Sequence, residues 1–496
     1  MKPIIPIIVL TLISAATTAS GQVLAQGITP EGLTTSKDAA TRTTLLTENT
    51  QSRTTSTDTA ITDSPAQQAQ AKALTLRECM EYAVSNSTQV RIQQSKNDDA
   101  RLDRRDAILE AFTPSAEGNS YGYYRWGRSI DPETNTYLTT TSFNQGFSVS
   151  AGFTIFNGFS AINNLKIART SMSMGLSQER QERDKVCLAT MEAYFNVIYY
   201  TKLTEILEDK VNNAKSAVQL AERQEQLGSK GYADVVQMKA DLADREYELM
   251  TAKNSRDNAR ITLEDVMYWP VDEELVIDTD LTALQPASKQ DIAADDIVNT
   301  AAKSMPSVLI ARNQRDNAFY SLRTAKWQFL PSLGLYGGWS TSYYTYPGQS
   351  GYTPVPYGRQ FRNNGGEYVQ LSLTIPIYDR LSKHTALAKK RNAYQRASLE
   401  YDKSLRDVES EVRRAVQDRD GAEAALLQAE RRAEVYDEAF RLNARKFEQG
   451  LISSIEYNTA SSNYLKAQAE KLNAELQYQL KRRVVDYYNG VPYLEQ

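Results

Sequence analysis

The chain has 496 residues, room for two or three average domains, with 24% charged residues and a net charge of −4 at neutral pH. It has no basic excess of the kind nucleic-acid-binding proteins carry, so we expect no nucleic-acid partner. Histidine occurs once, at His384, and HExxH, GxSxG, CxxC and GxxxxGK[ST] motifs are missing from the sequence. We therefore expect no enzyme, no nucleotide-driven pump and no cofactor or metal.

The first 73 residues are expected to stand apart from the folded chain. Lys2 precedes an apolar run from Ile4 to Ile13, too short to span a bilayer, and small residues follow it. Residues 1–25 are thus interpreted as a signal peptide, with cleavage near residue 21 or 25. Residues 26–73 are rich in Thr, Ser and Gln and are predicted to be a disordered leader. No later stretch reaches 18 apolar residues, which excludes a helical membrane protein but not a β-barrel.

A first structural unit is predicted over residues 74–266. Helices are expected from Leu76, behind a Thr75 cap, and from 88 to 112, ending before Pro114. Strands follow at 115–126 and 143–155, with an exposed loop at 127–142 between them. After Asn157-Gly158 a helix runs over 160–226, and another over 233–266. At about 1.5 Å per residue, the first of these is a rod of roughly 100 Å.

The strand at 143–155 alternates strictly between apolar and polar side chains, which is typical of a strand with two different faces. The strand expected at 367–377 alternates in the same way. The apolar residues predicted to face lipid are Phe147, Val149, Phe153, Ile155, Val369, Leu371, Leu373 and Ile375. Tyrosines and tryptophans gather where the strands meet their loops, as at a membrane interface. The alternative is a soluble β-layer with aromatic cross-strand pairs.

The order of elements occurs twice, about 220 residues apart. Residues 88–100 align with 306–318, and AFTPS at 111–115 aligns with QFLPS at 328–332. The second unit, 301–490, is predicted to contain strands at 332–346 and 367–377, a long helix at 381–448 and a helix at 455–489. An exposed loop is expected at 347–366. Residues 267–300 would link the units, and 491–496 would form a tail.

Both long helices carry apolar residues at heptad spacing. In the first, Leu207, Val211 and Val218 belong to this row, and in the second Ala433, Phe440 and Phe447 do. Such rows with many alanines suit side-by-side packing of nearly parallel helices. A dimeric coiled coil would also explain the helices, but would leave the alternating strands unexplained.

Four strands cannot close a barrel, and hydrocarbon does not tolerate an open sheet edge. If the strands are membranous, several chains must pool them. Three chains would supply twelve strands, within the even-numbered range of outer-membrane barrels.

The two cysteines, Cys79 and Cys187, allow two interpretations in an exported protein. They are either two buried thiols on separate helices or a disulfide. The disulfide requires both segments to rise from the same rim of the sheet, so that the sulfurs reach similar heights.

From 74 to 490 the chain resembles the TolC-like outer-membrane efflux proteins. The resemblance rests on the doubled order of helix, F-x-P-S, strand, loop, strand, long helix, glycine turn and helix, with the phrases FTIFNGF and LTIPIYDR. It implies a mainly α fold with membrane β: a homotrimer whose strands form a 12-stranded β-barrel in the outer membrane and whose helices form a 12-helix α-barrel across the periplasm. Residues 267–300 would belong to an equatorial belt around this tunnel.

The resemblance also implies a passive exit duct of a tripartite efflux or type I secretion system in a Gram-negative bacterium. Its partners would be a periplasmic adaptor and, indirectly, an inner-membrane RND or ABC transporter. Turns at Gly228, Gly231 and Gly450 would dock the adaptor, and Asp234, Phe447 and Glu456 would lie at the periplasmic aperture. Phe447 lacks the hydroxyl of a closing tyrosine. Glu456 is either part of a cation-selective ring or a helix-start carboxylate that stabilises the helix dipole. The rival function is a periplasmic coiled-coil adaptor or scaffold without a membrane barrel.

Overall fold

A computed structural model describes residues 73–130, 135–280, 293–347 and 349–496, all of them within the unit formed by residues 70–496. The predicted signal peptide, almost all of the predicted leader and residues 281–292 of the predicted linker lie outside the described residues.

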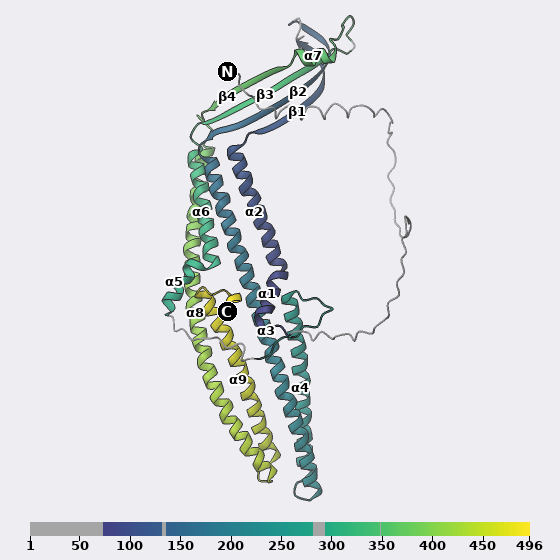
Figure 1. The fold of residues 1–496 in the computed structure, drawn as a ribbon, viewed down its shortest axis with the longest axis vertical. Coiled ribbons are helices and arrows are strands. Elements are labelled where there is room, and N and C mark those ends of the chain that lie inside the picture. The colour runs from purple at the N-terminus through teal and green to yellow at the C-terminus, as the bar shows by residue number, and fades with distance from the viewer. Residues whose placement is uncertain (1–72, 131–134, 281–292, 348) are drawn as a thin grey trace, which may run out of the picture. The chain divides into compact units, whose positions relative to one another are not determined.

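The described chain is mainly helical, with one small antiparallel sheet (Figure 1). Helices α3 (Ser160–Gln226) and α8 (Ser382–Glu448) have 67 residues each, and α3 has the bounds expected from the sequence. Helix α2 (Thr88–Phe112) also matches, and α8 begins one residue later than expected. Helices α4 (Tyr232–Met267) and α9 (Ser454–Tyr488) differ from expectation by one residue at each end. The remaining helices are α1 (Leu76–Asn86), α5 (Ala294–Ser304), α6 (Pro306–Trp327), α7 (Tyr357–Asn363) and the short 3₁₀ helix η2 (Tyr493–Glu495).

The sheet contains β1 (Ser115–Ile130), β2 (Tyr137–Asn157), β3 (Ser332–Thr345) and β4 (Gly366–Thr374), in the spatial order β1-β2-β3-β4. The predicted loop at 127–142 is wrong over most of its length, because β1 and β2 continue pairing up to Ile130 and Tyr137. The predicted loop at 347–366 contains α7. Strand β4 ends at Thr374, three residues earlier than expected, since Pro376 has no N–H to donate to a ladder.

Both strand-to-helix connections use the same backbone device. Gly158 and Phe159 have φ of +65° and +59°, and Arg380 and Leu381 have +57° and +64°. A Cβ at Gly158 would collide with the carbonyl of Trp327, so a side chain is excluded there. In the second connection the carboxylate of Asp379 accepts from the backbone N–H of Lys383, 2.9 Å away. The duplicated sequence thus builds two equivalent corners.

The long helices also end alike. At α3, the N–H of Gly228 binds the carbonyl of Glu225 and that of Ser229 binds Gln224; at α8, Gly450 and Leu451 repeat the pattern. Gly228 and Gly450 have φ of +75° and +73°. These bonds define Schellman motifs, in which glycine adopts the left-handed conformation without steric cost. Both glycines therefore end their helices, as the sequence predicted.

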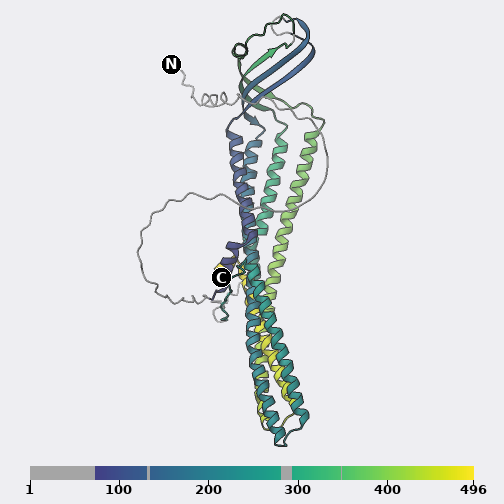
Figure 2. The ribbon, with the colours of Figure 1, turned by 90° about the vertical axis from the view of Figure 1, so that its right-hand side faces the viewer.

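The apolar core lies between helices. The heptad row of α3 is buried from Leu207 to Ala221 against α4 (Figure 2), and α8 packs along α9 (Figure 1). A larger cluster surrounds Met191, Tyr194 and Ile198 near the middle of α3, where α1, α4 and η2 contribute side chains. There Leu74 bridges to Ile277, and the Tyr194 hydroxyl donates to the Asp278 carbonyl at 2.6 Å.

No helix within the described ranges combines the length and apolarity needed to cross a membrane.

Candidate functional site

The two faces of the sheet differ in chemistry, as the alternation predicted. Strand β4 leaves its apolar side chains uncovered in the chain: Val369 is 83% exposed, Leu371 64% and Leu373 62%. The opposite face carries Gln370, Ser372 and Thr374 on β4 and Ser148 and Ser150 on β2. An apolar face this exposed requires a cover of low polarity.

The remaining predicted lipid-facing residues are placed less uniformly. Val149 and Ile155 are about half exposed, but Phe147 is only partly so because its ring lies 5.6 Å from that of Phe361 on α7. Phe153 is also partly covered. Ile375 lies beyond the end of β4, although its side chain is 59% exposed.

Helix α7 covers the edge of β3 where β4 no longer reaches. The Gln360 side-chain amide donates to the Tyr344 carbonyl at 2.9 Å and accepts from its N–H at 3.0 Å. Gln360 thus takes the position of a β4 residue beside Tyr344, which pairs with Asn144 of β2 on its other side. Asn364 binds the Ser342 carbonyl at 2.8 Å, and Thr341 binds the Phe361 carbonyl at 2.7 Å. This edge cover could not be predicted from the sequence, since a glutamine within a Gly/Pro/Tyr-rich segment carries no strand signal.

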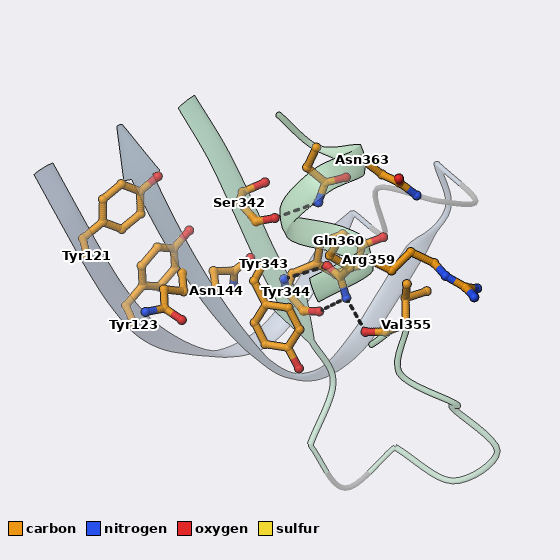
Figure 3. Close-up of a pocket in the computed structure, with 12 residues that line it drawn as sticks. Tyr121, Tyr123, Asn144, Ser342, Tyr343, Tyr344, Val355, Arg359, Gln360 and Asn363 are labelled. Atoms are coloured by element: carbon orange, nitrogen blue, oxygen red, sulfur yellow. Dashed lines mark hydrogen bonds between the residues drawn. The ribbon is translucent and has the colours of Figure 1, made fainter. Parts of the chain in front are cut away.

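A hollow of about 530 Å³ lies between this part of the sheet and α7 (Figure 3). Tyr121, Tyr123 and Asn144 line it from β1 and β2, and Arg359 and Asn363 belong to its lining on α7. Its lining is polar and aromatic, with one cation. No cluster of metal-ligating side chains occurs in the part of the chain that the structure describes.

At the other end of the long helices, the first turns of α4 and α9 meet. The hydroxyl of Ser454 donates to the carboxylate of Asp234 at 2.8 Å. Ser454 is 2% exposed, while Asp234 is only partly buried. Asp234 thus lies in the first turn of α4, close to the turn that ends α3, and it is engaged within its own chain. Its position at a periplasmic aperture stays a prediction.

Phe447 is buried rather than exposed toward an opening. It is 2% exposed and lies among Val218, Ala221, Val235 and Met238, with the ring of Tyr457 stacked 4.6 Å away. The Lys230 ammonium sits 3.6 Å from the Phe447 ring centroid. Within the described chain the Phe447 ring therefore joins the α3–α4 helix pair to the α8–α9 helix pair and does not line a passage.

Glu456 caps its own helix. Its carboxylate accepts from the N–H of Ser453 at 3.2 Å, and the Ser453 hydroxyl accepts from the N–H of Glu456 at 3.3 Å. This reciprocal pair is a capping box. The geometry supports the helix-start interpretation for one chain, while leaving the carboxylate at the exposed tip.

Lys210 of α3 also joins these two helix pairs, at a position farther from the helix turns than Phe447. Lys210 was not among the residues predicted from the sequence. Its ammonium lies 4.3 Å from the ring centroid of Phe440 and 4.2 Å from that of Tyr464. Burial, reinforced by the charge of Arg245, lowers the pKa of Lys210 to about 8. A lysine beside an apolar heptad row is ordinarily assigned to solvent, so sequence alone gives no signal of this contact.

Both cysteines are free buried thiols. The disulfide interpretation is therefore wrong in this structure, and the two-thiol alternative holds. Cys79 of α1 and Cys187 of α3 lie in the same apolar cluster. Burial, with smaller effects from nearby carboxylates, raises the pKa of each to about 12.

The two-unit order, the two-faced sheet and the paired helix turns agree with one known family. The sequence matches the model of the outer membrane efflux proteins over residues 119–267 and 297–485. This chain belongs to the outer membrane efflux protein family. It is therefore a TolC-family transport protein of the Gram-negative outer membrane that extends into the periplasm.

Solved structures of outer-membrane channels share its fold. CusC aligns with a TM-score of 0.70 at 16% identity, covering 84% of this chain and 92% of CusC. VceC of Vibrio cholerae aligns with a TM-score of 0.68 at 14% identity, covering 84% of this chain and 96% of VceC. The open state of the Neisseria gonorrhoeae MtrE channel aligns with a TM-score of 0.66 at 16% identity, covering 85% of this chain and 88% of MtrE. No curated protein matches the sequence. The family and these neighbours are channel proteins, so an outer-membrane efflux channel is the supported function.

Proposed function

We propose that three copies of this chain form the passive exit duct of a tripartite efflux or type I secretion system. One observation carries the proposal. The four-stranded sheet has an exposed apolar face, and its outer strands β1 and β4 each pair with one neighbour among the described residues. Open backbone edges are not tolerated in hydrocarbon, so the sheet must be closed by further strands. Three copies supply twelve.

The helices would continue this barrel as a tunnel. Helices α3 and α8 have 67 residues each, which corresponds to roughly 100 Å at 1.5 Å per residue. Within one chain they pack with α4, α9, α2 and α6. Pooling three copies gives a wall of twelve helical rods in cross-section. Residues around Leu74 and Ile277, together with η2, would belong to the equatorial belt.

The helix turns would receive the periplasmic adaptor, which in turn contacts an inner-membrane RND or ABC transporter. Gly228, Gly231 and Gly450 leave open space around their Cα atoms, since an added Cβ would meet nothing within 4 Å. Apolar side chains beside them are exposed: Leu227 82%, Tyr232 72%, Leu451 69% and Ile455 65%. Exposed apolar groups at a helix turn suit a helical partner that buries them.

The periplasmic aperture would lie beside these turns. Three copies each of Asp234 and Glu456 around a common axis would attract cations and repel anions. The bond from Ser454 to Asp234 and the packing of Phe447 hold the two turns of one chain together. Opening would require these contacts, or their counterparts between copies, to rearrange as a two-state packing change.

Conductance of the purified protein in planar lipid bilayers tests this function. The proposal predicts stepwise ion currents, and an outer-membrane band that migrates as a trimer when samples are not boiled. A soluble periplasmic monomer that neither inserts nor conducts would instead support the adaptor or scaffold. Deleting the gene and profiling sensitivity to drugs and metals, with complementation, would identify the class of cargo.

A further inference from the structure

Each strand pair in the sheet contains a tyrosine whose ring lies over the glycine directly opposite. Tyr121 of β1 faces Gly146 of β2, Tyr336 of β3 faces Gly152 of β2, and Tyr368 of β4 faces Gly338 of β3. A Cβ added at Gly146, Gly152 or Gly338 would come within about 3 Å of that tyrosine ring. All three pairs lie on the polar face. An aromatic ring laid across a strand glycine covers backbone that would otherwise be bare, and it fixes the register of the pair.

The two free edges of the sheet hold the unmatched halves of a fourth pair. Gly366 opens β4 on the same face, and a Cβ there would meet nothing within 4 Å. Tyr123 of β1, two residues beyond Tyr121, is 49% exposed and projects from the same face (Figure 3). Rotation about its Cα–Cβ bond can turn the ring toward the free edge of β1.

We propose that β4 of one copy pairs antiparallel with β1 of the next, with Gly366 directly opposite Tyr123. This inference rests on the trimer of the proposed function and specifies its junction. The register aligns the strand ends, since Thr374, the last residue of β4, then faces Ser115, the first of β1. It also completes the ladder of tyrosines over glycines around the polar face.

The outer face fits the same register. Val369, Leu371 and Leu373 of β4 fall opposite Ser120, Gly118 and Ala116 of β1. The large apolar side chains thus meet small ones, just as Val149 of β2 already faces Gly118 from the other side. A shift by one residue would set the polar face of one copy against the apolar face of the next and is excluded.

The strand tilt of the barrel distinguishes among the registers that keep each face continuous, in which Gly366 lies opposite Tyr121, Tyr123 or Arg125. Following directly opposite residues from Ser115 leads to Gly152, Tyr336 and Gln370, and the proposed pairing continues to Asn119 of the next copy. The path advances by four residues per copy, about 13 Å over about 19 Å of circumference, which is a tilt of about 35°. A pairing of Gly366 with Tyr121 would give about 19°, below the usual range of about 35–45°. A pairing with Arg125 would give about 46° and leave Gly366 uncovered.

Cysteine cross-linking in the intact protein measures this register. Asn119→Cys with Gln370→Cys places two thiols opposite each other only in the proposed pairing. The matched controls are Glu117→Cys with Gln370→Cys, for the pairing with Tyr121, and Asn119→Cys with Ser372→Cys, for the pairing with Arg125. Wild type, whose Cys79 and Cys187 are buried, supplies the background. Mild oxidation in membranes should give a covalent trimer on denaturing gels mainly for the 119/370 variant.

A dominant cross-link in either control would overturn the register while leaving the trimer intact. A trimer by mass with no cross-link in any variant would also overturn it. A monomer by mass would instead contradict the proposed function. The ladder itself is tested by Tyr123→Ala, expected to lower the temperature at which the trimer dissociates, against Tyr123→Phe, which keeps the ring and should match wild type. Equal dissociation temperatures for the alanine variant and wild type would refute the role of the ring.

Discussion

The hydroxyl of Ser454 donates a 2.8 Å hydrogen bond to the carboxylate of Asp234, joining the first turns of two helices that the repeat makes equivalent. The two residues are 220 positions apart, which is close to the length of the repeat. The bond therefore ties the turn of the first unit to the turn of the second. Phe447 and Lys230 lie beside it. Together these contacts hold the two turns of each chain as one body.

Asp234→Ala should loosen the two turns relative to each other. The buried hydroxyl of Ser454 would lose its acceptor, at a cost of about 1–3 kcal/mol. Amide hydrogen exchange should accelerate over residues 228–236 and 450–457. Asp244→Ala, an exposed position on the same helix, is the control and should leave exchange unchanged. Equal exchange in the two variants would show that the bond contributes nothing to the tip.

Gln360→Ala should release α7 from the edge of β3. The two hydrogen bonds of the Gln360 side chain to the N–H and carbonyl of Tyr344 would be lost, at about 0.5–1.5 kcal/mol each. Limited proteolysis of intact cells should cut the segment between Tyr346 and Gly366 faster than in wild type. Arg359→Ala, the adjacent position, should be cut at the wild-type rate. Cleavage of the Gln360 variant at the same rate as wild type would argue against the edge cover.

Glu456→Gln separates the charge of this residue from its capping function. The amide oxygen can still accept from the N–H of Ser453, so the unfolding temperature should stay near that of wild type. If three copies of Glu456 face the conducting path, reversal potentials in a salt gradient should shift toward lower cation selectivity. Glu475→Gln, higher on the same helix, serves as the control. An unchanged reversal potential would leave only the capping function.

The two thiols should resist modification in the folded protein. Burial raises the pKa of Cys79 and of Cys187 from 9.0 to about 12, so few thiolates exist at pH 8. A maleimide should label neither residue until the chain is denatured, and then both without a reductant. The folded protein holds these protons more tightly than the unfolded chain. Their contribution to stability is therefore full below about pH 9 and is lost as the pH rises toward 12. If the denatured chain could be labelled only after addition of a reductant, the two cysteines would be shown to form a disulfide.

The long helices could be predicted from the sequence nearly to the residue, because heptad spacing and the closing glycines at 228 and 450 are local signals. The hairpin between β1 and β2 was underestimated, since Arg125, Arg128 and the threonines at 139–141 obscure the apolar alternation that marks a strand. Strand ladders can include such residues when they extend beyond a buried face.

The contacts between distant residues could not be predicted. Ser454 with Asp234 and Gln360 with Tyr344 depend on how elements pack, which no local pattern encodes. The two-thiol outcome also depends on side-chain geometry within the apolar cluster rather than on spacing along the chain. The tyrosine–glycine ladder could be predicted only in part. Its members are visible in the sequence, but their pairing appears only once the register of the sheet is known.

The proposed trimer is best tested by the detergent-corrected mass of the protein extracted from outer membranes, because the proposed barrel requires the strands of three copies. Light scattering after size-exclusion chromatography measures this mass independently of shape. We expect three copies per particle. A monodisperse monomer that remains folded in the membrane extract would contradict it.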